Sequence, residues 1–563
     1  MSVISIDFGN HSTKIHHFYN GVFKTINSPS GNITIPSRIV FCENNRLFGD
    51  FSIYTNKGLY NNIKNKLFDN KLFDNKSYEN EREQLFDKIT YLTYQNKDIN
   101  AKMLTIMYLT NIYKHIRFNL KDSVIPDMFV YTFPDYILEV KRYKNIIQQI
   151  HSEKNKIVLI PESIAIGLNY GLYKLMDGSY NKETSILFID IGEISTSFYI
   201  IEYKGQEMKI LFKWVIEDVG SAFLDKSLTL YLYNKFIEQH NLDKECEETI
   251  IKNRIMKKIY YKCEGFRKRL NTNNKINCNI EAVYKDYDLN ITITREEYNE
   301  CCRIAITKFR NSLIVFKHNF KYENIELIGG LSRFYIFNDI LSELISKKIV
   351  KTTLNREECI SRGGSIYGAN KMTMYKNIDI KIRYKYCFGD LYIKVNKNEP
   401  VLLIGKDDYI PFNKDIKFSS KENMVQIYRE GEDIPIKIFM LKPVDILMKF
   451  IIDLDLIHHY IYKSMMNVNK SDENNIDNNF EGNADGNDDM NNTTDYIKLE
   501  EELNKLDIVY HNKQTMLNKI EEHIYDYKNK GRGVKRLEKW MYEKSRDASI
   551  DDIKLVYDKI NGN

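Results

Sequence analysis

VISIDFGNHSTK, from Val3 to Lys14, is the stretch that decides the fold, and ILFIDIGEISTS, from Ile186 to Ser197, repeats its pattern. In each stretch an apolar run typical of a β-strand ends in Asp-x-Gly. Such a turn brings a carboxylate to the edge of a sheet, and its glycine lets backbone N–H groups approach an anion without a Cβ atom in the way. A third strand-like run, IELIGGLSR from Ile325 to Arg333, ends in Gly-Gly. The repeated device predicts an ATP clamp built from two duplicated lobes.

The composition limits the classes of partner and compartment. The chain has 563 residues, 82 basic and 77 acidic side chains and a net charge of +5, which predicts several domains and no nucleic-acid-binding face. Its eight cysteines form no CxxC pair, which favours reduced thiols over disulfides or zinc sites. The first strand starts at Val3, and no uncharged apolar run is long enough to span a bilayer. We therefore expect a cytoplasmic protein with no membrane partner.

Three regions follow from the residue patterns along the chain. Over residues 1–372, apolar β-like runs alternate with helix-like segments, which is typical of the α/β class. Over residues 377–442, period-two runs such as IDIKIRYKY predict a small antiparallel, sandwich-like β-domain. Residues 443–563 are expected to form a helical domain that contains a disordered, acidic, Asn-rich loop at 468–495. That loop has too few large apolar side chains to offset the entropy of ordering it.

Individual helices are expected within these regions from hydrophobic periodicity. In the α/β region they cover Ala101 to His115, Val219 to Glu238, Glu245 to Leu270 and Arg295 to Phe316. In the last region they cover Pro443 to Met466, Tyr496 to Asn529 and Gly533 to Ile560. The sequence KLFDN occurs twice in tandem, at residues 66–75, and is either a surface duplication or the place of a functional lysine.

Eight motifs follow one another within residues 1–372. They are IDFGNHSTK at 6–14, YTFPDYILEVKR at 131–142, IPESIAIGLNYGL at 160–172, IDIGEIS at 189–195, VGSAFLD at 219–225, KCEGFRKRLN at 262–271, IGGLSR at 328–333 and LNREECISRGGSIYGA at 354–369. In this order they resemble the phosphate loops, connecting helices and adenosine-binding segments of the 70-kDa heat-shock chaperones, which belong to the actin and sugar-kinase ATPase superfamily. The resemblance implies a two-lobed, actin-like ATPase domain that binds ATP or ADP with Mg²⁺.

The same resemblance assigns roles to residues on both sides of the cleft between the lobes. Asp7 and Asp190 would hold Mg²⁺ through water, because magnesium takes few carboxylates and keeps several waters. Glu162 would help to orient the attacking water, and Lys71 would approach the transferred phosphate, with Lys66 as the competing assignment. Backbone groups and short polar side chains would surround the phosphates at Gly9, Asn10, His11, Gly192, Gly220 and Ser221. A solvent-facing turn histidine is the alternative for His11, because the family usually has threonine there.

The resemblance places the nucleoside between a helix and a turn of the second lobe. One helix face would hold the ribose and stack on the adenine, through turn-spaced side chains at Glu264, Arg267, Lys268 and Asn271. An exposed, salt-bridged helix face is the alternative interpretation of these positions. The turn would close the other side of the site through Gly329, Gly330, Leu331 and Arg333.

The second phosphate turn departs from the pattern of the foldase chaperones. Glu193 and Ile194 stand where that pattern commonly has glycine, and Ser197 replaces a catalytic aspartate. Loss of a water-orienting group and of a phosphate donor can remove several kilocalories of transition-state stabilisation, and each loss of about 1.4 kcal/mol slows the reaction about tenfold. We therefore expect nucleotide binding with a weak ATPase activity at most.

Other features are similar to the divergent 110-kDa heat-shock branch: the short DIG loop, TTLNREE at 352–358, NNIKN at 61–65 and the absence of a leucine-rich acidic linker after Asn370. This resemblance implies a nucleotide-exchange factor that releases ADP from a cytosolic 70-kDa chaperone, with holding of unfolded polypeptides on the β-domain as a second role. Two alternatives are an ATP-hydrolysing foldase and a ribosome-associated atypical chaperone paired with a J-protein. The β-domain and helical tail give no support to an actin-like or sugar-kinase-like enzyme.

Overall fold

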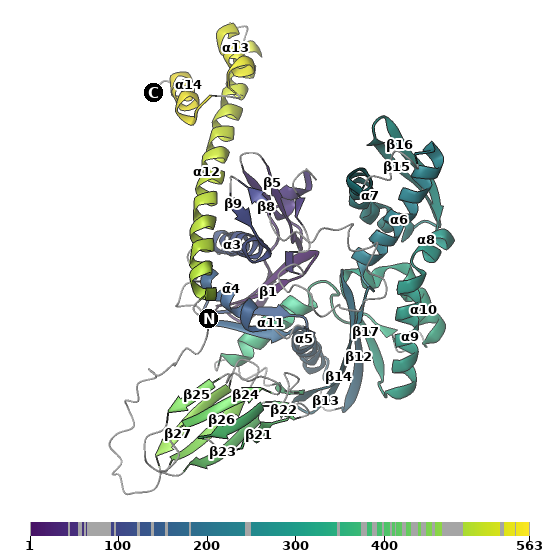
Figure 1. The fold of residues 1–563 in the computed structure, drawn as a ribbon, viewed down its shortest axis with the longest axis vertical. Helices are drawn as coiled ribbons and strands as arrows, with labels where there is room; N and C mark the ends of the chain where they lie inside the picture. Colours follow the sequence, from purple (N-terminus) through teal and green to yellow (C-terminus); the bar gives the residue numbers. More distant parts are fainter. Residues whose placement is uncertain are drawn as a thin grey trace.

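The computed structural model describes residues 2–42, 45–54, 59–60, 63–64, 92–94, 97–120, 124–136, 140–151, 156–179, 182–242, 249–345, 350–372, 380–385, 391–396, 399–405, 408–410, 412–418, 424–429, 437–440, 446–452, 457–463, 488–529, 534–545 and 548–561. Two lobes stand side by side, a β-domain lies below them, and a long helix runs along the outer side of the first lobe (Figure 1). Among these residues, no helix has both the length and the apolar character that a membrane span requires.

Lobe I is built on a mixed sheet in the order β11-β10-β1-β2-β3, with β4 paired to β2. Its strands are β1 (Ser2–Phe8), β2 (Ser12–Tyr19), β3 (Val22–Thr25), β4 (Ile35–Pro36), β10 (Met128–Phe133) and β11 (Lys156–Pro161). The parallel neighbours β1 and β10 are buried along their whole length, as expected for strands covered on both faces. The antiparallel return of β2 places Lys14 opposite Asp7.

Smaller elements complete lobe I. They are β5 (Ile39–Phe41), β6 (Arg46–Phe48), β7 (Leu59–Tyr60), β8 (Leu92–Tyr94), β9 (Lys97–Ile99), the 3-10 turn η1 (Gly49–Tyr54) and the helices α3 (Ala101–Asn119) and α4 (Val140–Ile150). The apolar faces of α3 and α4 share a core with β1. The side chain of Asn100 caps the start of α3, because its Oδ1 accepts a hydrogen bond from the Met103 N–H at 2.9 Å.

Lobe II repeats the plan of lobe I. Its sheet has the order β18-β17-β12-β13-β14, with strands β12 (Thr184–Ile191), β13 (Ser195–Lys204), β14 (Glu207–Glu217), β17 (Asn324–Ile328) and β18 (Val350–Lys351). The hairpin β12–β13 corresponds to β1–β2, and the parallel strands β17 and β18 correspond to β10 and β11. The duplicated pair of lobes predicted from the two Asp-x-Gly turns is therefore confirmed.

Helices and a hairpin cover the sheet of lobe II and fill its core. They are α6 (Ser221–His240), α7 (Thr249–Leu270), β15 (Lys275–Tyr284), β16 (Tyr287–Thr294), α8 (Arg295–Cys301), α9 (Arg303–Asn319), the 3-10 turn η4 (Gly330–Arg333) and α10 (Tyr335–Leu344). The helix expected from Arg295 to Phe316 is present as two helices that break at Cys302. A capping box between Thr294 and Glu297 fixes where the first of them begins.

Two connecting helices, α5 (Glu162–Met176) and α11 (Cys359–Lys371), pack between the sheets of the two lobes. A Cβ atom on Gly363 would lie 1.8 Å from the carbonyl oxygen of Ala165, so only glycine permits this close crossing of the helices. Apolar residues of β1, β10, β12 and β13 complete the shared core around them. The two phosphate turns are thus carried by sheets that meet through one packed layer.

The β-domain contains two sheets in the part of the chain that the structure describes, β21-β20-β24-β25 and β23-β26-β27. The strands are β20 (Leu391–Val395), β21 (Val401–Ile404), β23 (Phe412–Phe418), β24 (Met424–Arg429), β25 (Lys437–Met440), β26 (Ile446–Ile452) and β27 (Ile457–Lys463). The helix expected from Pro443 to Met466 is therefore wrong, and the helical domain does not begin at 443. Branched and aromatic residues in ILMKFII and IHHYIYK favour strands, and periodicity alone cannot distinguish such short apolar runs from helix.

Two strands near the start of the β-domain extend the sheet of lobe II. These are β19 (Lys381–Lys385) and β22 (Tyr409–Ile410), and β19 pairs in parallel with β14. The ammonium of Lys209 on β14 lies 4.5 Å from the ring centroid of Tyr409. Ile380 and Leu391 join the core between the lobes. The β-domain is thus attached to lobe II by backbone pairing and by shared apolar packing.

The C-terminal helices are α12 (Asp488–Asn529), α13 (Lys535–Glu543) and α14 (Ile550–Asn561). The first half of α12 lies beside α3 and α4, where Leu503 joins the core of lobe I (Figure 1). The later helices pack back on α12 around Ile520 and Ile553. The disordered loop expected at 468–495 is wrong for 488–495, which are helical, while 468–487 lie outside the described residues. A helix that packing has nucleated extends at little cost, because propagation is far easier than nucleation.

Candidate functional site

The β1–β2 turn of lobe I and the β12–β13 turn of lobe II meet between the lobes. Asp7 is 3% exposed, and its carboxylate accepts hydrogen bonds from the Lys14 ammonium at 3.3 Å and the Thr132 hydroxyl at 3.5 Å. Burial and the charge of Asp7 raise the pKa of Asp190 to about 6. Ser197, which is buried on β13, is the cross-strand partner of Asp190. The two carboxylates predicted to bind metal therefore share one buried electrostatic environment.

Glu162 and Lys64 form a second buried ion pair beside these acids. Glu162 is the first residue of α5, and its Oε1 accepts a hydrogen bond from the Lys64 Nζ at 3.3 Å. Burial raises the pKa of the Glu162 carboxyl, the Lys64 ammonium opposes that shift, and Asp7 and Asp190 add to it. The structure thus brings Glu162 to the two aspartates, which its predicted part in orienting water requires.

The His11 side chain is 55% exposed, as the solvent-facing alternative predicts, and it also lies between the two turns. Its Nδ1 lies 3.9 Å from the Glu193 carboxylate, and its Nε2 lies 3.6 Å from the Glu264 carboxylate on α7. The close approach and the charge of Glu193, together with the charge of Glu264, raise the pKa of His11. Glu264 also pairs with Lys268 one helical turn along at 2.8 Å, as the salt-bridged alternative predicts. His11 and Glu193, which both depart from the family pattern, are therefore close enough to interact by charge.

The second phosphate turn is closed onto the start of α6 by backbone contacts. The N–H of Ser221 donates to the carbonyl of Gly192 at 3.2 Å, and the N–H of Ala222 donates to the carbonyl of Glu193 at 2.8 Å. A Cβ atom on Gly220 would lie 2.3 Å from that Glu193 oxygen. Gly192 and Gly220 thus serve the contact between turn and helix, and in this arrangement the N–H of Ser221 is engaged within the protein.

The glycines of the first phosphate turn and of the Gly-Gly turn differ in the space around them. A Cβ atom on Gly9 would lie 2.6 Å from the carbonyl of Ser12, and Asn10 follows it in the turn towards His11. Gly329 has a φ of +81°, and a Cβ atom there would lie 2.3 Å from the carbonyl of Ile191. By contrast, a Cβ atom on Gly330 would meet nothing within 4 Å. The backbone at Gly330 is therefore open to a ligand, whereas Gly329 packs against the second phosphate turn.

Arg267 and Asn271, two of the residues expected to contact the nucleoside, make contacts within lobe II. The Arg267 guanidinium donates to both carboxylate oxygens of Asp225, at 2.7 and 3.1 Å, and both side chains are buried. The side-chain oxygen of Asn271 accepts a hydrogen bond from the Tyr335 N–H at 2.9 Å. These contacts tie α7 to α6 and to α10. Direct contact of either residue with a nucleotide stays a prediction.

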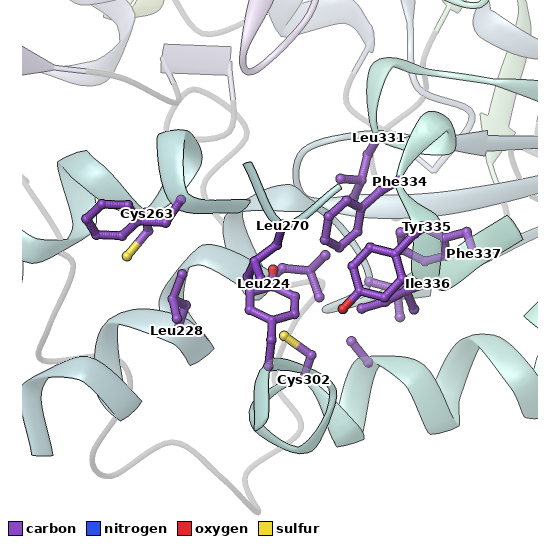
Figure 2. Packing of buried hydrophobic residues seen from close by; sticks show 14 of the residues in the cluster. Leu224, Leu228, Cys263, Leu270, Cys302, Leu331, Phe334, Tyr335, Ile336 and Phe337 are labelled. Atoms are coloured by element: carbon purple, nitrogen blue, oxygen red, sulfur yellow. The ribbon is translucent and has the colours of Figure 1, made fainter. Parts of the chain in front are cut away.

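Leu331 and Arg333 mark the inner and outer sides of the Gly-Gly turn. Leu331 is buried in the apolar core of lobe II, where Figure 2 shows it near Phe334 and Leu270. Arg333 is half exposed and pairs with Glu357 beside α11. The inner side of the Gly-Gly turn thus packs on the apolar core, and the outer side of the turn carries a charged side chain.

The fold and the site agree with a comparison against known protein families. A family model described as Hsp70 protein matches residues 3–429. The chain belongs to the Hsp70 family. The match runs through both lobes and into β24 of the β-domain, so the actin-like ATPase fold expected from the eight motifs is confirmed.

Individual Hsp70-family relatives are similar to this chain at low identity. Heat shock protein 88 of Dictyostelium discoideum is 27% identical over 218 residues, which cover 38% of this chain and 27% of that protein. Heat shock protein 110 of Caenorhabditis elegans is 22% identical over 391 residues, with 65% and 49% covered. Heat shock protein hsp88 of Neurospora crassa is 22% identical over 463 residues, with 77% and 64% covered. The chain thus matches 27% to 64% of the length of these three relatives.

Hsp70 proteins generally bind nucleotide with Mg²⁺, and the arrangement around Asp7 can be tested for that ion. The carboxylates of Asp7 and Asp190 are hard oxygen ligands of the kind that Mg²⁺ takes. The Lys14 Nζ, however, lies 3.3 Å from the Asp7 Oδ2. A magnesium ion separated from this oxygen by one water would stand at roughly 4 Å, so the ammonium takes up the space that the hydrated ion would need. Within the described ranges, no group of three or more His, Cys, Asp and Glu side chains offers another metal site. As arranged, these Hsp70 residues do not fit Mg²⁺ beside Asp7.

Sequence reasoning missed the lysine of the Glu162 pair. Lys71 and Lys66, the two candidates for the lysine near the transferred phosphate, lie outside the described residues, so their role stays a prediction. Lys64 is the lysine that reaches Glu162 within the described part of this Hsp70-family chain. It belongs to the NNIKN segment, which the sequence marks only as a sign of the family branch.

Lys14 was missed as well, although a signal for it was present in the sequence. Lys14 in the first hairpin corresponds to Ser197 in the second. Lys14 is the cross-strand partner of Asp7, and Ser197 is the cross-strand partner of Asp190. The resemblance assigns a catalytic group to this position in the second Asp-x-Gly motif only. The same position in the first half of the duplication holds the lysine.

Proposed function

We propose that this Hsp70-family chain is a nucleotide-binding chaperone of the heat-shock 110 type. In this role it would act in the cytoplasm as a nucleotide-exchange factor, releasing ADP from a separate 70-kDa chaperone. The observation that carries the proposal is the attachment of α12 to lobe I. A C-terminal helix fixed to one lobe offers a partner a composite surface, which changes when nucleotide moves one lobe relative to the other.

Arg46 is the centre of that attachment. Its side chain is 0% exposed, its Nη1 donates to the Glu500 carboxylate at 2.5 Å, and its Nε and Nη2 donate to Asp507 at 2.9 and 2.7 Å. Its backbone N–H also donates to Asp507 at 2.9 Å. Leu499 and Leu503 add apolar contacts with the core of lobe I. Removing one partner from such a buried ionic cluster is costly, so α12 follows lobe I as one body.

The second phosphate turn supports binding of ATP over its rapid hydrolysis. Ser197 stands opposite Asp190 without a carboxylate to orient water, and the carbonyl of Glu193 is engaged by α6. Loss of such a group typically slows a chemical step by about a hundredfold or more. ATP would then stabilise one arrangement of the lobes by differential affinity, and any ATPase activity of Glu162 and its neighbours would be weak.

The test is the release of labelled ADP from a 70-kDa chaperone, with and without this chain and with and without ATP. We expect faster release when both are present. Asp7→Ala and Gly330→Arg should abolish the acceleration by preventing nucleotide binding, and Arg46→Met should abolish it by freeing α12. Arg310→Met is the matched control, because it breaks only an exposed pair with Glu343. Unchanged release with the unmodified chain contradicts the proposal.

Two further measurements separate this proposal from the rival functions. Rapid single-turnover hydrolysis by the purified chain, stimulated by a J-domain, would identify an ATP-driven foldase instead. Co-purification with ribosomes rather than with a free 70-kDa chaperone would identify the ribosome-associated alternative.

Holding of unfolded polypeptides is a second role that one observation favours. Val401 and Leu402 on β21 are 61% and 43% exposed, and exposed apolar side chains offer contact area to the apolar side chains of an unfolded polypeptide. We expect the double change Val401→Asp and Leu402→Asp to reduce the suppression of client aggregation in a light-scattering assay. The single change Val22→Asp, on the exposed edge of lobe I, should leave it unchanged.

A further inference from the structure

Lys14 is a partly buried cation inside the candidate nucleotide site. Its Nζ donates to the Asp7 Oδ2 at 3.3 Å, and the side chains of Lys14 and Asp7 are 17% and 4% exposed. The pairing register of β1 and β2 fixes this contact, because the two residues are directly opposite each other. The charge therefore belongs to the rigid sheet of lobe I and not to a loose surface side chain.

The ammonium serves more than one carboxylate. It acts electrostatically on Asp190 and Glu162 as well as on Asp7. In the equivalent hairpin of lobe II, the cross-strand partner of Asp190 is Ser197, a neutral side chain. One lysine from lobe I therefore supplies positive charge to the acids of both lobes.

Lys14 also lies against the first phosphate turn. A Cβ atom built on Gly9 would lie 3.5 Å from the Lys14 Nζ, so the ammonium borders the backbone that is expected to meet the phosphates. A lysine ammonium has three donors and no acceptor, so one donor can stay on Asp7 while others reach phosphate oxygens. A cation held at this place can satisfy both the acids and a polyanion.

We propose that Lys14 is a built-in cation of this site, which does the work of a divalent metal and lets a nucleoside polyphosphate bind without Mg²⁺. The inference rests on the proposed nucleotide site between the two phosphate turns. It follows from the mismatch with Mg²⁺, because a hydrated dication beside Asp7 would have to displace the ammonium or lie next to a like charge. It also explains how the carboxylates of Asp7 and Asp190 coexist before any ligand enters.

The test measures the affinity of the full-length protein for a fluorescent ADP, by equilibrium titration with excess Mg²⁺ and with EDTA. The unmodified chain should bind with affinities that differ by less than about threefold between the two conditions. In Lys14→Met the affinity in EDTA should fall by about tenfold or more, the scale of one charge-assisted hydrogen bond. Added Mg²⁺ should restore much of it, because the position beside Asp7 is then open to the ion.

Lys24→Met is the matched control, because Lys24 is exposed on β3 of the same sheet; it should bind as the unmodified chain does in both conditions. Recovery of Lys14→Met by Mg²⁺ also shows that the variant is folded. Binding of ADP by the unmodified chain only in the presence of Mg²⁺ overturns this inference and leaves the proposed nucleotide-exchange function intact. Failure to bind ADP or ATP in either condition overturns both.

Discussion

At the scale of single residues, His11 joins the phosphate turns of the two lobes by charge. The nearby Glu193 carboxylate raises the pKa of His11 above the ordinary value of 6.5, and the charge of Glu264 adds to the rise. The stabilisation is therefore fully present below that ordinary value and is lost as the pH rises through the raised pKa. Because the His11 side chain is 55% exposed, solvent screens the pair and keeps its contribution below about 1 kcal/mol. The bridge acts as a weak contact between the lobes near neutral pH.

This bridge can be measured directly as a histidine titration. Glu193→Gln should lower the pKa of His11, since it removes the largest cause of the rise. NMR of the imidazole resonances, with His11→Asn to assign the signal, gives the value. Glu183→Gln, an exposed acid before the start of β12, is the control and should leave the His11 titration unchanged. An identical pKa in the Glu193 variant would show that the two turns do not meet.

Two glycines with a similar positive φ allow the cost of backbone strain to be separated from the cost of a steric clash. Gly329 and Gly31 have φ values of +81° and +84°, but only a Cβ on Gly329 would collide, at 2.3 Å from the carbonyl of Ile191. Gly31→Ala should lower the unfolding free energy by about 1–2 kcal/mol through its positive φ alone. Gly329→Ala should cost several kcal/mol more because backbone must also move. Equal losses in denaturant unfolding would contradict the close packing of the turns.

Much of the site was predictable from the residues themselves. Asp-x-Gly and Gly-Gly located Asp7, Asp190 and Gly329, because the chemistry of a strand-end turn is local in sequence. The contact of Lys14 with Asp7 was not predicted, because it depends on the pairing register of two strands, which the sequence does not show directly. The same limit applies to the ion pair of Arg267 and Asp225. The two residues lie on different helices, and the sequence does not show that these helices pack against each other.

At the scale of elements, the attachment of α12 rests on a cluster that can be broken at one residue. Arg46→Met would leave Glu500 buried without its partner, at a cost of about 3–5 kcal/mol. We expect faster proteolysis within α12 and lower stability to denaturant, whereas Arg310→Met, which breaks an exposed pair, should cost less than about 1 kcal/mol. Unchanged proteolysis of α12 in the Arg46 variant would show that the helix is not held by this cluster.

Long helices and the strands that lead into the phosphate turns were predicted well, whereas the two strands within residues 446–463 were not. The helices α3, α6 and α7 carry apolar periodicity over many residues, and each was expected within a few residues of its observed bounds. The strands β26 and β27 were taken for helix, because the apolar runs are short and their identity depends on pairing with β23. The start of α12 was missed for a related reason, since contacts made by its later residues stabilise it.

At the scale of the whole molecule, the β-domain and lobe II share a sheet. The strand β19 pairs with the edge strand β14 of lobe II. The side chain of Ile380, just before β19, lies beside Gly171 and Tyr203. A fragment ending at residue 372 would expose the edge of β14 and part of the apolar core, so it should unfold at a lower temperature and aggregate more readily than the full chain. Equal thermal stability and solubility of the fragment and the full chain would contradict this shared core.

We propose that nucleotide bound between the lobes controls a surface for a second chaperone. The most direct measurement is the rate of labelled-ADP release from a 70-kDa chaperone mixed with this chain, followed in the presence and absence of ATP. We expect release that is faster by about tenfold or more with ATP, a change of about 1.4 kcal/mol in the barrier. The same rate with and without ATP would contradict it.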